Sequence, residues 1–299
     1  MTRRNTVSYR LVVLSFLLPS LVGFATFILI PTIATVGLSF TDFRGGSDFG
    51  FVGLKNYVQA FKTPAFLNSL WVTLKFVVIS VTAELVLALA FALMLNQERP
   101  GKTFFRGLFF IPVVLSNIAV SMGFSLIFDV RRGPVNQFLE SVGFDPLPFL
   151  TSPDTALGTI MFVMVWQQFG YFMVIFLAGL QTISPSLYEN ADLDGASYLQ
   201  KLKSITLPML SPTTFFAMVV AIIRGFQVFD QVFILTGGQF GGGPQGSTSV
   251  LVFKIYQNAF THFRMGYAAA QATVLLLFVL LVTVIQYTRQ TKWVNYDAT

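Results

Sequence analysis

The sequence predicts an all-α integral membrane protein with six transmembrane helices, and three observations lead to this fold class. First, 54% of the 299 residues are hydrophobic and only 11% are charged, whereas about a quarter of the residues in a soluble domain are charged. Second, the charges are separated by apolar intervals that can each hold the roughly 20 residues of a membrane-crossing helix. Third, these intervals are continuously apolar, which excludes the alternating pattern of a transmembrane barrel.

Each predicted span fills one interval between charged residues. Four intervals contain no charge, and those of the second and fifth spans contain only Glu84 and Arg224 respectively. The six expected spans are 12–38, 71–95, 106–128, 156–180, 212–235 and 266–288. The first follows a basic N-terminus, but it is too long for a signal peptide and ends without a small-residue cleavage site. We therefore expect it to be retained, and residues 1–299 to form a single transmembrane domain.

The distribution of charge predicts the orientation of the chain. With the N-terminus in the cytoplasm, the inner segments hold ten basic and five acidic residues, and the longer outer loops hold seven basic and six acidic residues. Cytoplasmic segments of membrane proteins are enriched in Lys and Arg. The sequence thus favours a multi-pass protein of the cell membrane with both termini in the cytoplasm.

Several chemistries are excluded by composition. The chain has no Cys and one His, His262, so disulfides and His-based metal clusters are excluded. The glycine-rich run 237–243 lacks a following Lys-Ser/Thr pair and is no phosphate-binding loop, so we expect no ATP site in this chain. In the outer loop 129–155, Gly133-Pro134 precedes a short amphipathic helix expected over Val135–Val142.

The segment 184–208, between the fourth and fifth spans, carries the strongest local signals. Ser184 followed by Pro185 is typical of a helix start, and Gly195 accepts the turn geometry that ends a short helix over 186–194. A second helix is expected to follow and to stop near Pro208. From residue types alone, this helix–turn–helix is as compatible with a solvated connection as with a surface for a partner.

The motif Glu189-x-Ala191-x-x-Asp194-Gly195-Ala196, followed by Ile205-x-Leu207-Pro208, resembles the "EAA" signature of ABC-importer permeases. These are the inner-membrane components of binding-protein-dependent transport systems. The sequence departs from the signature at Asn190, where the family usually has Ala. The resemblance implies that 184–208 is a coupling element docking on a cytosolic ATPase, with Glu189, Ala191, Asp194 and Gly195 in the contacting segment.

The resemblance covers the whole chain and is of the carbohydrate type. Matching stretches are Pro19, Pro31, 39–42, 51–57, 237–238, 243–244, 256–260 and 266–269. The chain is similar to permeases of sugar and glycerol-3-phosphate importers, and to the large maltose permease without its long external loop. This implies a type I ABC-importer permease fold. The implied partners are a second permease subunit, an extracytoplasmic solute-binding protein, and a cytosolic ATPase dimer holding ATP and Mg²⁺. We expect no cofactor or catalysis in this chain, and no nucleic acid partner.

Polar residues within the predicted spans are candidate sites, because ionisable groups in lipid are costly. In the fifth span, Arg224, Gln227 and Gln231 fall at i, i+3 and i+7, on one helix face, and Asp230 lies beside them. The fourth span offers a polar and aromatic cluster interrupted by Gly170, and the third has one amide. These further candidates are Trp166, Gln167, Gln168, Tyr171 and Asn117.

Amides beside an aromatic platform suit a polyhydroxylated ligand, since hydroxyl groups both donate and accept hydrogen bonds. Arg224 would equally suit a phosphate or carboxylate. In the related maltose permease the sugar binds at mid-membrane, on helices matching spans three to five, which points to Asn117, 166–171 and 225–228. The alternative role for these polar residues is hydrogen bonding between two permease subunits.

Two other functions remain open from the residues alone. An ATP-independent transporter or channel would use Glu84, Arg224 and Asp230 as an ion relay, although Glu84 is expected rather to pair with a buried cation such as Arg224. A membrane enzyme would need clustered carboxylates or His at the interface, and the outer acidic residues are scattered. The substrate stays open between an oligosaccharide and glycerol-3-phosphate or a related polyol phosphate.

Overall fold

The computed structural model describes residues 6–47, 49–97, 100–238, 241–291 and 293–294. In these ranges every element is helical except one isolated bridge between Thr41 and Phe51. Seven of the charges used to predict the orientation lie outside the described residues: Arg3, Arg4, Asp48, Glu98, Arg99, Lys292 and Asp297. The contacts divide the chain into two compact units. One comprises Met1–Lys62 and Ile255–Leu275, and the other Thr63–Lys254 and Leu276–Thr299.

Four described helical segments are long and apolar enough to cross a membrane, and two bent helix pairs bring the number to as many as six. The four are Val12–Leu38, Pro64–Leu95, Ala156–Gln181 and Met265–Gln290. The first combines α1 (Thr6–Phe24), a π-helical turn (Ala25–Leu29) and α2 (Ile30–Leu38). The helix of the predicted second span begins at Pro64, seven residues before position 71, because a proline at the first helical position starts it.

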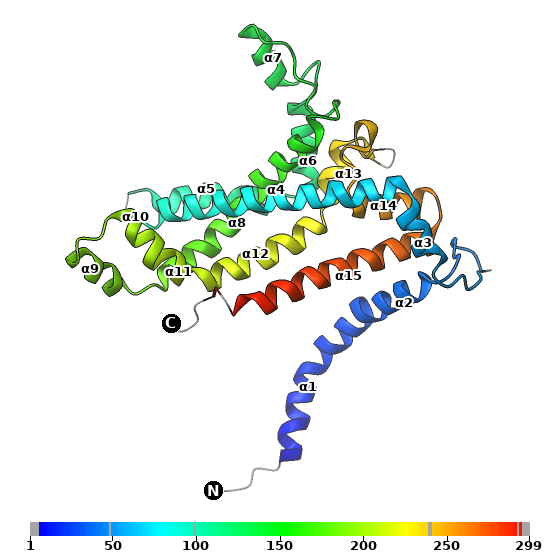
Figure 1. The fold of residues 1–299 in the computed structure, drawn as a ribbon, viewed down its shortest axis with the longest axis horizontal. Coiled ribbons are helices and arrows are strands. Elements are labelled where there is room, and N and C mark those ends of the chain that lie inside the picture. Colours follow the sequence, from blue (N-terminus) through cyan, green and yellow to red (C-terminus); the bar gives the residue numbers. More distant parts are fainter. Residues whose placement is uncertain (1–5, 48, 98–99, 239–240, 292, 295–299) are drawn as a thin grey trace. The chain divides into compact units, whose positions relative to one another are not determined.

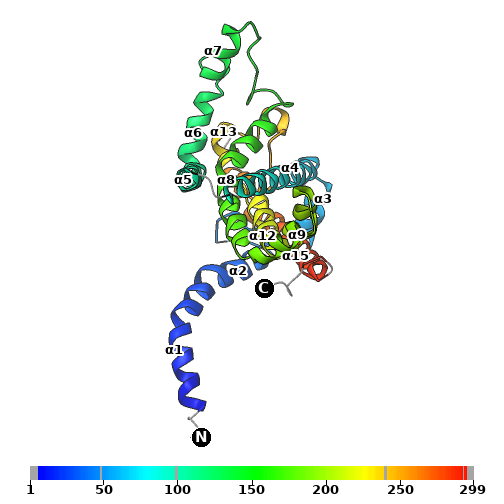
Figure 2. The ribbon, with the colours of Figure 1, turned by 90° about the vertical axis from the view of Figure 1, so that its left-hand side faces the viewer.

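The larger unit is built around α4 (Pro64–Leu95), α8 (Ala156–Gln181) and α12 (Ser211–Phe226), which pack against one another (Figures 1 and 2). Large side chains such as Phe76, Phe172 and Phe176 fill the space between them. Gly170, which interrupts the polar and aromatic cluster in the sequence, lies within the continuous helix α8. A Cβ atom at Gly170 would overlap the carbonyl of Phe109 in α5 (Lys102–Val114), so this glycine permits a close approach of two helices.

The third predicted span, 106–128, is not one continuous helix. It consists of α5 and α6 (Asn117–Ile127), which meet at 95° (Figure 1). Leu115 and Ser116 have extended backbone at the break. The buried Gln167 side chain donates a hydrogen bond to the Leu115 carbonyl at 3.2 Å, which satisfies a backbone group that the break leaves without a helical partner.

The fifth predicted helix, 212–235, is also interrupted. The helix α12 ends at Phe226, and a short helix, α13 (Asp230–Leu235), begins after three non-helical residues. Gly225 lies at the end of α12, where Val77 and Val81 of α4 would stand 3.3 to 3.4 Å from an added Cβ. Arg224, Gln227 and Gln231 therefore do not share one helix face, and the prediction of an i, i+3, i+7 stripe is wrong.

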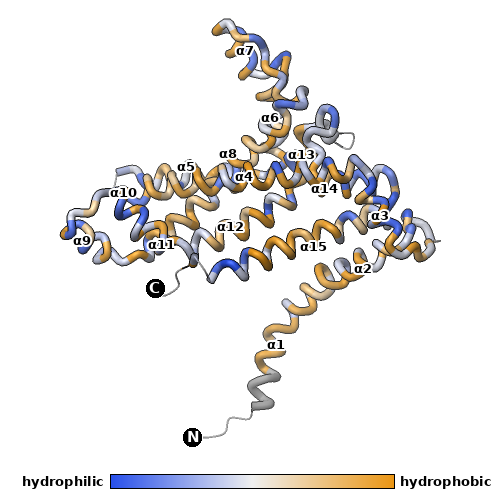
Figure 3. The backbone as a smooth tube through the Cα atoms, viewed as in Figure 1, coloured by the Kyte–Doolittle hydropathy of each residue, from blue (hydrophilic) through white to orange (hydrophobic). Residues whose placement is uncertain are grey.

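The 184–208 segment forms the helix–turn–helix that the sequence predicted. It contains α9 (Pro185–Leu193), α10 (Tyr198–Lys201), a π-helical turn (Leu202–Thr206) and α11 (Leu207–Met209). Gly195 has a φ of +75°, the left-handed conformation that favours glycine. Figure 3 shows hydrophilic residues concentrated at α9 and α10, in contrast to the apolar α1 and α15 (Met265–Gln290).

Short helices lie outside the long apolar segments. The expected helix in the 129–155 loop is α7 (Pro134–Ser141), where the buried Asn136 side chain bonds the backbone of Val130 and Leu147. The remaining elements are α3 (Lys55–Lys62), a 3-10 turn (Pro244–Gly246), α14 (Leu251–Tyr256) and a π-helical turn (Gln257–Thr261).

Candidate functional site

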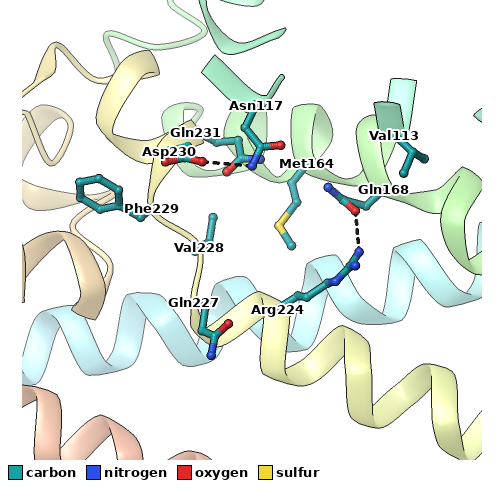
Figure 4. A pocket seen from close by; sticks show the side chains of 10 residues that line it. All are labelled: Val113, Asn117, Met164, Gln168, Arg224, Gln227, Val228, Phe229, Asp230 and Gln231. Atoms are coloured by element: carbon teal, nitrogen blue, oxygen red, sulfur yellow. Dashed lines mark hydrogen bonds between the residues drawn. The ribbon is translucent and has the colours of Figure 1, made fainter. Parts of the chain in front are cut away.

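The larger unit contains a polar cavity of about 380 Å³, called here the Arg224 cavity (Figure 4). It lies where both interrupted helices break, so that a helix end, a helix start and the non-helical residues 227–229 all face it. Its lining residues are Val113, Asn117, Met164, Gln168, Arg224, Gln227, Val228, Phe229, Asp230 and Gln231. Irregular backbone at membrane depth is tolerated where it lines such a cavity.

Asn117 and Asp230 each begin a helix after a break, and this placement brings them together. The Asn117 amide donates a hydrogen bond to the Asp230 carboxylate, with 3.1 Å between Nδ2 and Oδ2. The two residues are 113 positions apart in the sequence, so the bond joins α6 to α13. It leaves the carboxylate of Asp230 on the cavity wall as a hydrogen-bond acceptor.

Arg224 projects into the cavity from the last turn of α12 (Figure 4). Its Nη1 donates to the Gln168 side-chain oxygen at 3.0 Å, and its guanidinium carbon lies 4.3 Å from the centroid of the Tyr171 ring. The expected pairing with Glu84 is not formed, since no ion pair joins these two described residues. Glu84 is buried, and its Oε1 has no hydrogen-bond partner. The guanidinium is thus held by an amide and an aromatic face.

Five of the eight predicted pathway residues line the cavity: Asn117, Gln168, Arg224, Gln227 and Gln231. The other three have structural positions. Gln167 is buried, where it supports Leu115 and accepts a 3.4 Å hydrogen bond from Gln231. The Trp166 ring packs edge to face against Phe124, and Tyr171 lies against Arg224.

Three lining residues were not found from the sequence: Val113, Met164 and Phe229. Val228 lies in the segment 225–228, which the resemblance had indicated. Val113 and Met164 carry no signal, because an apolar residue in an apolar helix is compatible with lipid, core or cavity. Phe229 could have been found only by recognising that the helix ends at Phe226. Val113, Met164, Val228 and Phe229 add apolar surface to the cavity lining.

The Arg224 cavity offers four amide side chains, one cation, one carboxylate and an aromatic ring. Amides supply both donors and acceptors, which is what sugar hydroxyl groups require. Within the described part of the chain, no three His, Cys, Asp or Glu residues are grouped so that they could hold a metal ion. The arrangement is therefore suited to binding and passage of a polar solute.

The 184–208 element presents a second candidate surface. Glu189, Asp194 and Gly195 are exposed, and Ala191 is half-buried. The turn is fixed by backbone hydrogen bonds from Gly195 to Asp192 and from Ala196 to Ala191. An ion pair of 2.6 Å between Lys201 and Asp192 ties α10 to α9.

Large apolar side chains are exposed on this otherwise hydrophilic element. Leu193 is 87% exposed, and Tyr198 and Leu199 are exposed by 60% and 63%. Their grouping beside a rigid turn is typical of a protein contact surface.

The fold and these two sites define a class: a helical membrane permease with a polar cavity and an exposed helix–turn–helix element. The chain belongs to the family described as "Binding-protein-dependent transport system inner membrane component", which matches residues 84–294. It is accordingly a permease subunit of an ATP-driven importer, located in the inner membrane. This assignment disfavours both the ion-coupled transporter and the membrane enzyme.

Individual relatives align with this chain over nearly its full length. The chain is 37% identical over 276 residues to the probable ABC transporter permease protein YurN of Bacillus subtilis, covering 91% of this chain and 93% of that protein. It is 34% identical to the trehalose/maltose transport system permease protein MalF of Thermococcus litoralis, covering 93% of each. A bacterial alginate ABC transporter structure shares the fold, with a TM-score of 0.84, 22% identity and 96% of each chain covered.

Proposed function

We propose that this permease carries a sugar or oligosaccharide, and that the solute passes through the Arg224 cavity. The observation that carries the proposal is the convergence of Asn117, Gln168, Gln227 and Gln231 on one cavity at the helix breaks. Amide groups can pair with many hydroxyl groups without demanding one sugar. The resemblance to a trehalose/maltose permease supports the same substrate class.

A polyol phosphate such as glycerol-3-phosphate is the second candidate. Arg224 favours it, because its guanidinium faces the cavity with only an amide partner and an aromatic ring. A guanidinium binds phosphate through two parallel hydrogen bonds. The Asp230 carboxylate on the same wall opposes an anion and favours a neutral sugar.

The proposed assembly has this chain beside a second permease subunit, a cytosolic ATPase dimer and an extracytoplasmic binding protein. ATP and Mg²⁺ would be held by the ATPase, and both termini of this chain would lie in the cytoplasm. Closure of the ATPase would act on the 184–208 element through Glu189, Ala191, Asp194 and Gly195. The exposed apolar residues of α9 and α10 support this docking.

The ion pair between Lys201 and Asp192 and the hydrogen bond between the Tyr188 and Thr206 hydroxyls join α9 to the following turns. A displacement of α9 would therefore be transmitted to α11 and α12. Because Arg224 belongs to the last turn of α12, this motion would reach the cavity and open it alternately to each side.

Uptake by cells that lack this chain tests the substrate class. We expect such cells to lose uptake of a labelled di- or oligosaccharide, and to recover it with the wild-type chain but not with the Q168A/Q227A variant. Q181A is the matched control, because Gln181 is an exposed amide at the end of the same helix as Gln168. Loss of glycerol-3-phosphate uptake instead of sugar uptake would favour the second candidate, and unchanged sugar uptake by Q168A/Q227A would overturn the cavity assignment.

A further inference from the structure

The smaller unit contains a pocket of about 150 Å³ that shares no residue with the Arg224 cavity or the 184–208 element, called here the basic pocket. It is formed by the chain that follows α2 and by the start of α15. Its lining residues are Asp42, Phe43, Arg44, Val52, Lys55, Asn56, Gln59, Arg264 and Tyr267. Both helices are continuously apolar, so the pocket lies where two membrane-crossing segments end.

The backbone around the basic pocket is held by specific hydrogen bonds. The buried Asn56 amide donates to the carbonyls of Ser39 and Thr41, at 2.9 and 2.8 Å. The Gly266 N–H donates to the Phe43 carbonyl at 2.8 Å. A Cβ at Gly266 would overlap the carbonyl of Thr41, so only glycine permits this contact. These hydrogen bonds therefore fix the backbone that forms the pocket.

The charge in the pocket is unbalanced. Three basic side chains, those of Arg44, Lys55 and Arg264, face a single acidic one, that of Asp42. Among the residues that the structure describes, no ion pair joins these four to a carboxylate or to one another. The Asp42 carboxylate accepts a 2.6 Å hydrogen bond from the Gly50 N–H, and the Arg264 guanidinium lies 4.5 Å from the centroid of the Tyr267 ring. Three cations with free donors near one cavity attract an anion.

Large apolar side chains next to the pocket residues in the sequence are exposed. Phe51 is 81% exposed, and Leu54, Val58 and Phe263 are each more than half exposed. Exposure of these side chains to water is energetically unfavourable, whereas aromatic and aliphatic side chains are stable at the boundary between lipid headgroups and acyl chains. This surrounding favours a lipid over a soluble anion or an acidic protein segment as the source of negative charge.

We propose that the basic pocket binds the phosphate group of an anionic membrane phospholipid. The guanidinium and ammonium donors of Arg44, Lys55 and Arg264 would contact the phosphate oxygens, while the exposed apolar side chains lie against the acyl chains. A headgroup with net negative charge is preferred over a zwitterionic one, because the pocket has an excess of positive charge and a cationic headgroup would approach it unfavourably.

Lipid titration of the purified full chain, read by native mass spectrometry, tests the proposal. The probes are phosphatidylglycerol and phosphatidylcholine with identical acyl chains. We expect the wild type to bind phosphatidylglycerol about tenfold more tightly, and the R44Q/K55Q variant to lose that preference. K55R should retain it. K62Q is the matched control, since Lys62 is an exposed lysine on the same short helix that does not line the pocket, and we expect its affinity to change by less than about twofold.

Several results would overturn the proposal. Equal affinity of the wild type for both lipids would leave only the apolar surroundings as the cause of binding. Unchanged phosphatidylglycerol affinity in R44Q/K55Q, or in K55Q alone should the double variant misfold, would place the lipid elsewhere. Displacement of phosphatidylglycerol by inorganic phosphate at equal concentration would make this a site for a soluble anion. If R44Q/K55Q bound lipid as the wild type does but its transport no longer responded to the binding protein, the basic side chains would instead pair with carboxylates of that protein.

Discussion

Arg224 shows how much a single polar residue in an apolar helix depends on its neighbours. The guanidinium has no carboxylate partner among the described residues, and Gln168 and Tyr171 hold it at the cavity. From its charge in an apolar span, Arg224 was predicted as a candidate site residue with Glu84 as its ion-pair partner; that ion pair is not formed, although the two charges interact at longer range. The reason is that complementary charge is a strong expectation in lipid, whereas an amide and an aromatic ring can together orient a cation as well.

We expect R224Q to reduce transport about tenfold or more, because hydrogen bonds to a charged group contribute about 1.5 to 3 kcal/mol. R224K retains the charge without the planar geometry and should fall between R224Q and the wild type. The measurement is the initial rate of solute uptake at equal protein level. The control is R132Q, which removes an exposed arginine outside the cavity lining and should leave the rate unchanged. A normal rate in R224Q would exclude Arg224 from the solute path.

At the scale of elements, two breaks decide the architecture of the cavity. The extended residues Leu115 and Ser116 turn α6 away from α5 by 95°, and three non-helical residues separate α12 from α13. Each break directs a helix start toward the cavity, with Asn117 on one side and Asp230 on the other. Two glycines, Gly170 and Gly225, allow the neighbouring helices to approach closely enough to enclose it.

Helix packing at Gly170 can be tested directly. G170A places a methyl group against the carbonyl of Phe109, so α8 and α5 must separate, at a cost of about 1 to 3 kcal/mol. We expect a lower melting temperature in detergent, measured by thermal denaturation with size-exclusion detection. G158A is the matched control in the same helix, because nothing lies within 4 Å of its Cβ position. It should be neutral or slightly stabilising, and equal melting temperatures for both variants would contradict the close approach.

At Gly195 the backbone conformation, and not the space around the residue, disfavours a side chain. Its φ is +75° and no atom lies within 4 Å of an added Cβ, so a side chain is disfavoured by the backbone alone, by about 1 to 2 kcal/mol. We expect G195V to uncouple ATP hydrolysis from uptake, with the affinity of the binding protein for its ligand unchanged. G195N should retain more transport, because asparagine tolerates the left-handed conformation.

The coupling assignment depends on the comparison of these two variants in one assay of ATP hydrolysis and uptake. Normal transport by G195V would contradict docking through this turn. Equal loss in G195V and G195N would instead indicate that the exposed surface, rather than the backbone geometry, is what the partner requires.

At the scale of the whole molecule, the chain is a permease subunit whose transport cycle requires other proteins. We expect purification in mild detergent to bring down a second hydrophobic permease and an ATPase with a phosphate-binding loop, identified by mass spectrometry. Uptake into vesicles should then require ATP. Recovery of this chain alone, with solute transport in the absence of ATP, would contradict the proposed assembly. It would instead favour an ATP-independent transporter that uses Glu84, Arg224 and Asp230 as an ion relay.

Features that depend on local composition and short-range geometry could be predicted from the sequence. Apolar length predicted the long helices, Pro185 and Gly195 predicted the limits of α9, and the Glu189–Pro208 motif predicted the family. Five of the eight predicted pathway residues, chosen for their polarity in an apolar span, line the Arg224 cavity. These signals are local, because hydropathy, proline and glycine act within a few residues.

The positions at which the third and fifth helices break, and the set of polar residues that share the cavity, depend on contacts between distant segments and could not be predicted from the sequence. The break at Leu115 depends on a hydrogen bond from Gln167, 52 residues away, and the position of Asn117 depends on Asp230. A broken helix in an apolar environment is stable only where distant side chains satisfy the freed backbone groups. That condition is a property of packing between segments, which no single stretch of sequence contains.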